Sequence, residues 1–180
     1  IKIMEDSVDD SQATPLKEEV SNLLFNKLRT VMMTDDTTVQ ELVCGPCLVG
    51  LQEKWVKPSP DVITWLEFIL HKAPIVQHFK ILTYHIDFMP SESIFNFLMN
   101  ANEVKDPDVV EASLQFIAQG FLKNPNLFKE VFECEYVVQF VTNKDEKICF
   151  AGLYLLGIMV YCDHCRHCIE DVIALLIEGS

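Results

Sequence analysis

The chain of 180 residues is poor in basic side chains, with 14 against 27 acidic ones, so its formal net charge at pH 7 is −13. This charge repels a phosphate backbone over the whole molecule, and no cluster of Lys and Arg overrides it locally. We therefore expect no nucleic-acid partner.

A long apolar run is also lacking. Residues 148–161 (ICFAGLYLLGIMVY) are apolar throughout, but Lys147 and Asp163 enclose them, and a membrane-spanning helix needs roughly 20 such residues. A short helix that is apolar on every side is typical of the interior of a soluble layered domain. We therefore expect no membrane partner.

Glycine is scarce, and its six copies form no common nucleotide-binding loop. GxGxxG does not occur, and residues 152–157 (GLYLLG) have the Walker spacing but precede Ile158 and Met159 in place of Lys and Ser or Thr. The GxSxG, HExxH and EF-hand patterns are missing from the sequence as well. The sequence thus favours a protein without catalytic residues or a cofactor, although an active site assembled from distant residues leaves no such signature.

Cysteine, by contrast, occurs seven times, an odd number for a chain that is 49 % hydrophobic and large enough to fold without disulfide staples. We expect reduced thiols and an intracellular protein, cytoplasmic or nuclear. The mean hydropathy of +0.18 is high for a soluble domain and predicts apolar surface to spare. Because the chain starts at Ile1, we expect it to be a piece of a longer protein.

Prolines that follow a capping residue mark predicted helix starts. The pairs are Thr14-Pro15, Ser59-Pro60, Asp106-Pro107 and Asn124-Pro125. Apolar residues between them recur at helical spacing, and no sustained period-2 alternation predicts a strand. The sequence predicts an all-α chain with helices at 15–33, 38–54 with a break near Pro46, 60–72, 74–87, 91–101, 107–123, 125–142 in one or two pieces, 145–162 and 165–178. Residues 1–13 form a predicted acidic, flexible lead-in, and 14–180 a single domain.

Two weak internal repeats relate parts of the chain. A shift of 39 residues aligns Ala112 with Ala151, Leu114 with Leu153 and Ile117 with Leu156. A shift of 47 relates residues 59–62 to 106–109. Periods near 40–47 are those of armadillo and HEAT units, which bury their faces only by stacking on a neighbour.

Over residues 60–178 the chain resembles the armadillo/HEAT superfamily in helix order and apolar spacing. The resemblance implies irregularly stacked helices and a role in binding another protein. A third interpretation is purely structural: the chain is one end of a longer solenoid whose other repeats carry the function. An irregular single-domain helical bundle is the alternative fold.

Residues 44–47 read CGPC, the redox motif of thioredoxins. In that motif the cysteines lie at a strand-to-helix junction, where the helix N-terminus lowers the thiol pKa. Here helical spacing precedes Cys44, and no βαβ pattern follows Cys47. We expect a helix kink lined by two buried thiols, with thiol-disulfide exchange as the alternative.

Residues 162–168 read CDHCRHC, and candidate zinc ligands among them are Cys162, Cys165, His167 and Cys168. A structural zinc site normally takes its second pair from another loop, and residues 44–47 contain the only other C-x2-C pair. We expect the thiols to face the core, with a zinc site as the alternative. His71, His78 and His85 recur every seven residues without a matching carboxylate, which predicts a polar edge beside the core.

The predicted function is that of a protein-interaction or scaffold domain. We expect an apolar groove that binds a partner helix or peptide with basic flanks, because stacked helices offer such a groove and the chain is acidic. Self-association is a second possibility. The candidate partner-binding residues come from two aromatic segments and are Phe95, Phe97, Phe128 and Phe132.

Overall fold

The structure is a computed structural model. It describes residues 35–166 apart from 55 and 90, residues 169–178, and the isolated positions 19, 20, 23 and 27. The predicted lead-in 1–13 and nearly all of the predicted helix 15–33 lie outside these residues. The described part is all-α and contains no strand, which confirms the all-α prediction.

Nine α-helices and two single-turn 3-10 helices make up the described part of the chain. They are α2 (Thr37–Gln52), α3 (Pro60–Ile69), α4 (Val76–Tyr84), η1 (Ile86–Phe88), α5 (Glu92–Met99), η2 (Ala101–Glu103), α6 (Pro107–Lys123), α7 (Pro125–Val131), α8 (Cys134–Val141), α9 (Glu146–Tyr161) and α10 (Ile169–Glu178). The predicted bounds of α6 are confirmed, and the segment predicted at 125–142 consists of the two helices α7 and α8.

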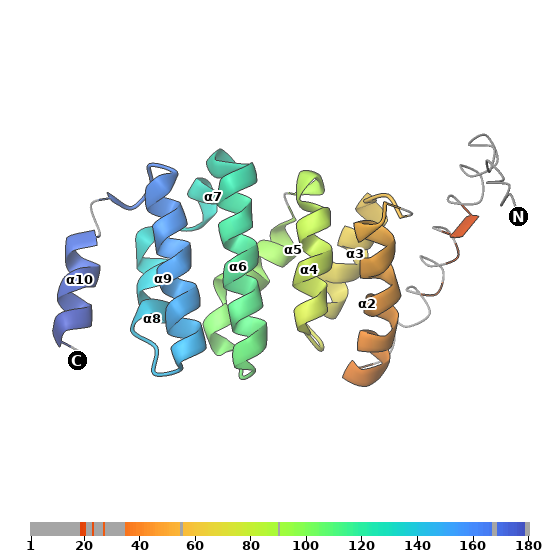
Figure 1. The fold of residues 1–180 in the computed structure, drawn as a ribbon, viewed down its shortest axis with the longest axis horizontal. Helices are drawn as coiled ribbons and strands as arrows, with labels where there is room; N and C mark the ends of the chain where they lie inside the picture. Colours follow the sequence, from red (N-terminus) through yellow and green to blue (C-terminus); the bar gives the residue numbers. More distant parts are fainter. Residues whose placement is uncertain are drawn as a thin grey trace, which may run out of the picture.

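The helices stand in two rows (Figure 1). The front row consists of α2, α4, α6 and α9, and each of these helices packs against the next. The shorter helices α3, α5, α7 and α8 lie behind them, and α10 stands at the C-terminal end of the row. The inner helices α4 and α6 therefore have a front-row neighbour on each side, the back row behind them, and one face turned outward.

Aspartate side chains cap the front-row helices α2, α6 and α9, whereas Ile75 at the start of α4 makes no such hydrogen bond. Asp106 Oδ1 accepts a hydrogen bond from Asp108 N at 3.0 Å at the start of α6, and Asp145 Oδ1 accepts one from Lys147 N at 2.9 Å at the start of α9. Such caps satisfy backbone donors that have no partner within the helix. In the back row, Ser59 caps α3 in the same way. The prolines at these starts cost nothing, since the first helical N–H groups are unpaired anyway.

The predicted shift of 39 residues relates two neighbours. Lys147 and Asp108, which are 39 positions apart, both follow a capping aspartate and meet in an ion pair of 2.6 Å between α9 and α6. The shift of 47 instead relates the start of α3 to the start of α6, which lie in different rows.

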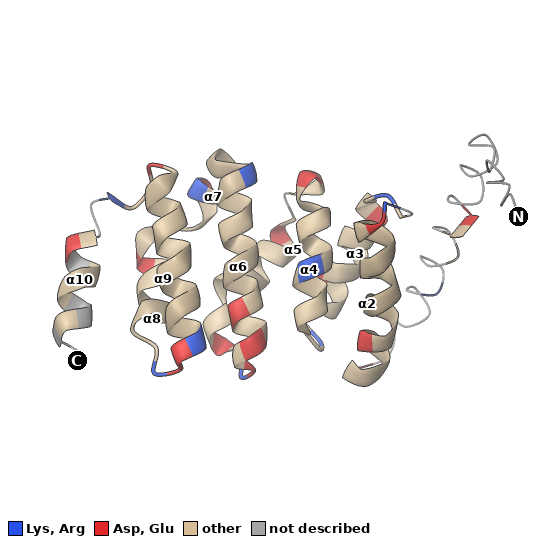
Figure 2. Ribbon diagram, viewed as in Figure 1, with Lys and Arg blue, Asp and Glu red and all other residues tan. Residues whose placement is uncertain are grey.

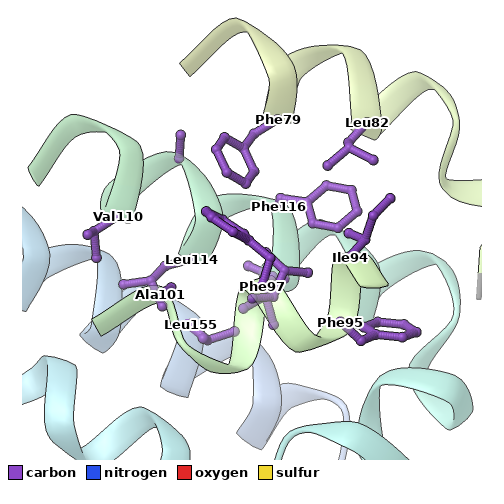
Figure 3. Packing of buried hydrophobic residues seen from close by; sticks show 14 of the residues in the cluster. Phe79, Leu82, Ile94, Phe95, Phe97, Ala101, Val110, Leu114, Phe116 and Leu155 are labelled. Atoms are coloured by element: carbon purple, nitrogen blue, oxygen red, sulfur yellow. The ribbon is translucent and has the colours of Figure 1, made fainter. Parts of the chain in front are cut away.

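The core fills the space between the two rows (Figure 3). In that view Phe79 and Leu82 from α4 point toward Phe116 of α6 and Ile94 of α5. Gly120 allows α6 to pack closely against α7, because a Cβ atom at this position would lie 2.1 Å from the ring of Phe128 in α7.

The predicted break of the helix near Pro46 is wrong, because α2 runs through this residue. Pro46 lies on the exposed side of α2. The proline removes one helical donor, that of its own N–H. The carbonyl of Leu42 loses that donor, and Leu42 is 71 % exposed, so the hydrogen bond is lost on the solvent-facing side of the helix.

Candidate functional site

The four predicted partner-binding residues are core residues. Phe95 and Phe97 are 7 % and 8 % exposed, and Phe128 and Phe132 are fully buried. The ring of Phe128 lies 5.5 Å from that of Phe95 and 5.9 Å from that of Phe132, centroid to centroid. Side chains this deeply enclosed offer little surface to a partner, so we look for a docking surface among the more exposed residues.

The two thiols of the CGPC segment are buried inside α2. Cys44 and Cys47 are 0 % and 1 % exposed, and Cys44 lies about two turns from the helix start. Burial raises the pKa of Cys44 to about 12, with Cys47 and Glu41 adding to the effect, and raises the pKa of Cys47 to about 11. A redox-active cysteine needs the opposite shift.

The cysteine-rich segment at 162–168 begins as a turn after α9. Cys162 Sγ donates to Phe121 O at 3.5 Å, His164 Nε2 lies 2.9 Å from Phe132 O, and Cys165 is buried. His167 and Cys168 lie outside the described residues. Among the residues that the structure does describe, no three His, Cys, Asp or Glu side chains converge as a metal site requires. The described side chains of the segment anchor it to the core.

The three histidines do not form one polar edge. His71 is exposed, with Nε2 at 3.1 Å from Ser93 Oγ. His78 and His85 are fully buried, which corrects the prediction for these two residues. Burial lowers the pKa of His78 to about 3 and also lowers the pKa of His85, although the hydrogen bond to the Ile81 carbonyl opposes the latter. Both therefore act as neutral core side chains at physiological pH.

The three most exposed aromatic side chains among the described residues lie on α9. Phe150, Tyr154 and Tyr161 are 68 %, 49 % and 79 % exposed. They fall at i, i+4 and i+11, which places them on one face of the helix. Gly157 lies on the same face at i+7, and a Cβ atom there would meet nothing within 4 Å. We call these four residues the α9 aromatic face.

A groove runs beside this face, across the outward side of three front-row helices. It has a volume of about 500 Å³ and is lined by residues of α4, α6 and α9. Its accessible walls carry Lys80, Thr83, Glu111, Gln115, Phe150 and Tyr154. We call it the front groove.

Few charges surround the front groove. In Figure 2 the middle of the front row is mostly uncharged, and acidic residues gather at the lower end of α6. Lys147 lies there: its hydrogen bond to Asp108 and the nearby charges of Asp108, Glu111 and Asp145 raise its pKa. Glu111 also accepts a hydrogen bond from Gln115 Nε2 at 2.9 Å. One end of the groove is thus acidic, and its other walls combine apolar side chains with the amide of Gln115 and the cation of Lys80.

Comparison with protein-family models, with curated proteins and with solved structures finds no match to this chain. The geometry therefore carries the functional argument alone. None of the described helices combines the length and the apolar character that a membrane span requires.

Sequence reasoning missed Phe150, Tyr154 and Tyr161, because it assigned the whole run 148–161 to the domain interior. The signal that could have found them is the run itself. It leaves no polar face for a helix that stands in an outer row.

Proposed function

We propose that the chain is a non-enzymatic, intracellular interaction domain of the armadillo or HEAT type. It binds another protein through the front groove and the α9 aromatic face. Its two rows of packed helices, and the 39-residue shift between the neighbours α6 and α9, support the repeat-like architecture.

The observation that carries the proposal is the exposure of Phe150 and Tyr154 beside a groove. The shift of 39 residues relates them to Glu111 and Gln115 of α6, which line the same groove. Stacking of a front-row helix therefore does not require an aromatic side chain at these positions, since polar residues occupy them one helix earlier. An aromatic pair that the fold does not need is better explained by binding.

Burial of Phe150 and Tyr154 against a partner provides enough free energy for recognition. Burial of one large apolar side chain contributes roughly 1.5–3 kcal/mol. Two such anchors in a groove are typical of the residues that dominate protein interfaces. The acidic end of the groove and the net charge of −13 favour a partner helix or peptide with basic flanks, whose association slows as salt rises.

The double variant Phe150→Ala/Tyr154→Ala tests the proposal. Its matched control is Leu42→Ala/Val49→Ala on the outward side of α2, where the side chains are 71 % and 49 % exposed. A partner is first isolated from native cells with the wild-type chain and purified, and its affinity for each variant is then measured by titration calorimetry.

We expect the groove variant to bind at least about tenfold more weakly, which corresponds to roughly 1.4 kcal/mol, and the control to bind as the wild type does. Equal affinity of the groove variant and the wild type, with both variants folded, would show that the partner docks elsewhere.

A further inference from the structure

We propose that the α9 aromatic face seats α9 of a second copy of this chain, with the two helices antiparallel about a two-fold axis. The inference rests on the proposed function in using the same surface, but it names a second copy of the chain as the occupant in place of a partner with basic flanks. It goes further in fixing which residue of one copy meets which residue of the other.

The spacing of the face is self-complementary. In an antiparallel pair related by a two-fold axis, each contact is repeated in reverse. When the axis passes midway between Tyr154 and Gly157, Tyr154 of each copy lies opposite Gly157 of the other. The same axis places Phe150 opposite Tyr161 at both ends of the contact. A large ring thus meets the one position of the face that has no side chain, and an aromatic pair closes each end.

The space for this arrangement is present in the single chain. A Cβ atom at Gly157 would meet nothing within 4 Å, so the space above this glycine is open and is not filled by the chain's own side chains. The face spans eleven residues of α9, or about 16 Å of helix at 1.5 Å per residue. Antiparallel helices that cross at a shallow angle keep contact over such a length.

The available area suits a reversible dimer. A large aromatic side chain buries roughly 150–250 Å². With 68 %, 49 % and 79 % of Phe150, Tyr154 and Tyr161 exposed, the three side chains offer on the order of 400 Å² per copy. A standard stable interface buries about 800 Å² per partner. The aromatic side chains supply about half of this, and the walls of the front groove lie beside them to supply more.

The salt dependence of binding distinguishes a second copy of the chain from a basic peptide as the occupant. Two copies that each carry −13 repel one another, and salt screens this repulsion. Self-association through an apolar face should therefore strengthen as ionic strength rises, whereas binding of a basic partner should weaken.

Sedimentation equilibrium tests the proposal on the full chain, from micromolar to roughly millimolar protein. We compare the wild type with Gly157→Tyr and with the exchanged variant Tyr154→Ala/Gly157→Tyr, and confirm each fold by circular dichroism. Because Gly157 borders open space, both variants should fold.

We expect the wild type to approach twice its monomer mass of 20.6 kDa, and to do so at lower concentration in high salt. Gly157→Tyr should weaken the dimer at least tenfold, because two tyrosines then face each other. The exchanged variant should restore it, since a large residue again faces a small one.

A wild type that stays monomeric throughout overturns the proposal. So does a dimer that Gly157→Tyr leaves unchanged, or one that the exchange fails to restore. If the chain is monomeric and Phe150→Ala/Tyr154→Ala still abolishes binding of a different protein, the second copy is excluded and the proposed function stands.

Discussion

Two glycines on neighbouring front-row helices should respond oppositely to the same substitution. At Gly120 of α6, an ideal Cβ atom would lie 2.1 Å from two ring atoms of Phe128. That ring cannot move aside, because it is fully buried and packs against Phe116 and Phe121. At Gly157 of α9 the same atom meets nothing within 4 Å.

The magnitudes follow from two opposing terms. Alanine in a helix interior is favoured over glycine by about 1 kcal/mol, and at Gly157 this term acts alone. At Gly120 overpacking costs roughly 1–3 kcal/mol, and the upper part of that range applies because the contact is more than about 1 Å shorter than the favourable carbon–carbon separation. We expect Gly157→Ala to gain about 1 kcal/mol and Gly120→Ala to lose about 2 kcal/mol.

Urea unfolding followed by circular dichroism measures both changes, at low micromolar protein so that self-association does not contribute. In thermal melts the shifts should be about +3 °C for Gly157→Ala and about −6 °C for Gly120→Ala in a chain of this length. Wild-type stability of Gly120→Ala would refute the close approach of α6 and α7. Destabilisation by Gly157→Ala would mean that this face is already covered within the single chain.

Three further predictions concern the core. Tyr136→Phe should cost about 1–2 kcal/mol of unfolding free energy in urea, because the buried hydroxyl donates to Leu98 O at 2.6 Å; an unchanged midpoint would contradict this bond. The free energy of unfolding should fall as the pH drops below about 6.5, because His78 binds a proton in the unfolded chain but stays neutral in the folded one, where its pKa is lowered to about 3. The slope should approach roughly 1.4 kcal/mol per pH unit, and it should be smaller in His78→Gln. Cys44 and Cys47 should be alkylated at least roughly 100-fold more slowly in the native protein than in denaturant, because their pKa values are raised to about 12 and about 11. Mass spectrometry measures both rates, and equal rates would show that the thiols are exposed.

Helix positions were predictable where local chemistry decides them. The start of α6 follows from Asp106 and Pro107, which cap and pre-shape the first turn, and its end follows from the next proline at position 125. The predicted break at Pro46 was wrong because the cost of a proline within a helix depends on which side of the helix it occupies. The sequence reveals the proline, but only the packed structure shows that its side faces water.

The partner surface was not predictable from aromatic density. Segments rich in phenylalanine, such as those around Phe97 and Phe128, are strongly apolar, and this property places them between the rows, away from the surface. Two helices that pack on each other require large side chains at their contact. Aromatic density therefore identifies the core first, and exposure must be argued from a different feature.

That feature is a mismatch between a helix and its place in the fold. A helix in the front row has an outward face, which in α6 carries Glu111 and Gln115. The run 148–161 has no polar residue to put there, so any two-layer stack of these helices must expose some of its side chains. The all-α prediction and this run together already require an apolar outer face on α9. Which side chains form it depends on the rotation of α9 about its axis. That rotation follows from the buried residues of α9, among them Leu155 and Met159, and from the close packing of Gly152 against α8, where a Cβ atom would lie 2.9 Å from Phe140 Cβ. Once this rotation is fixed, Phe150, Tyr154 and Tyr161 can only point outward.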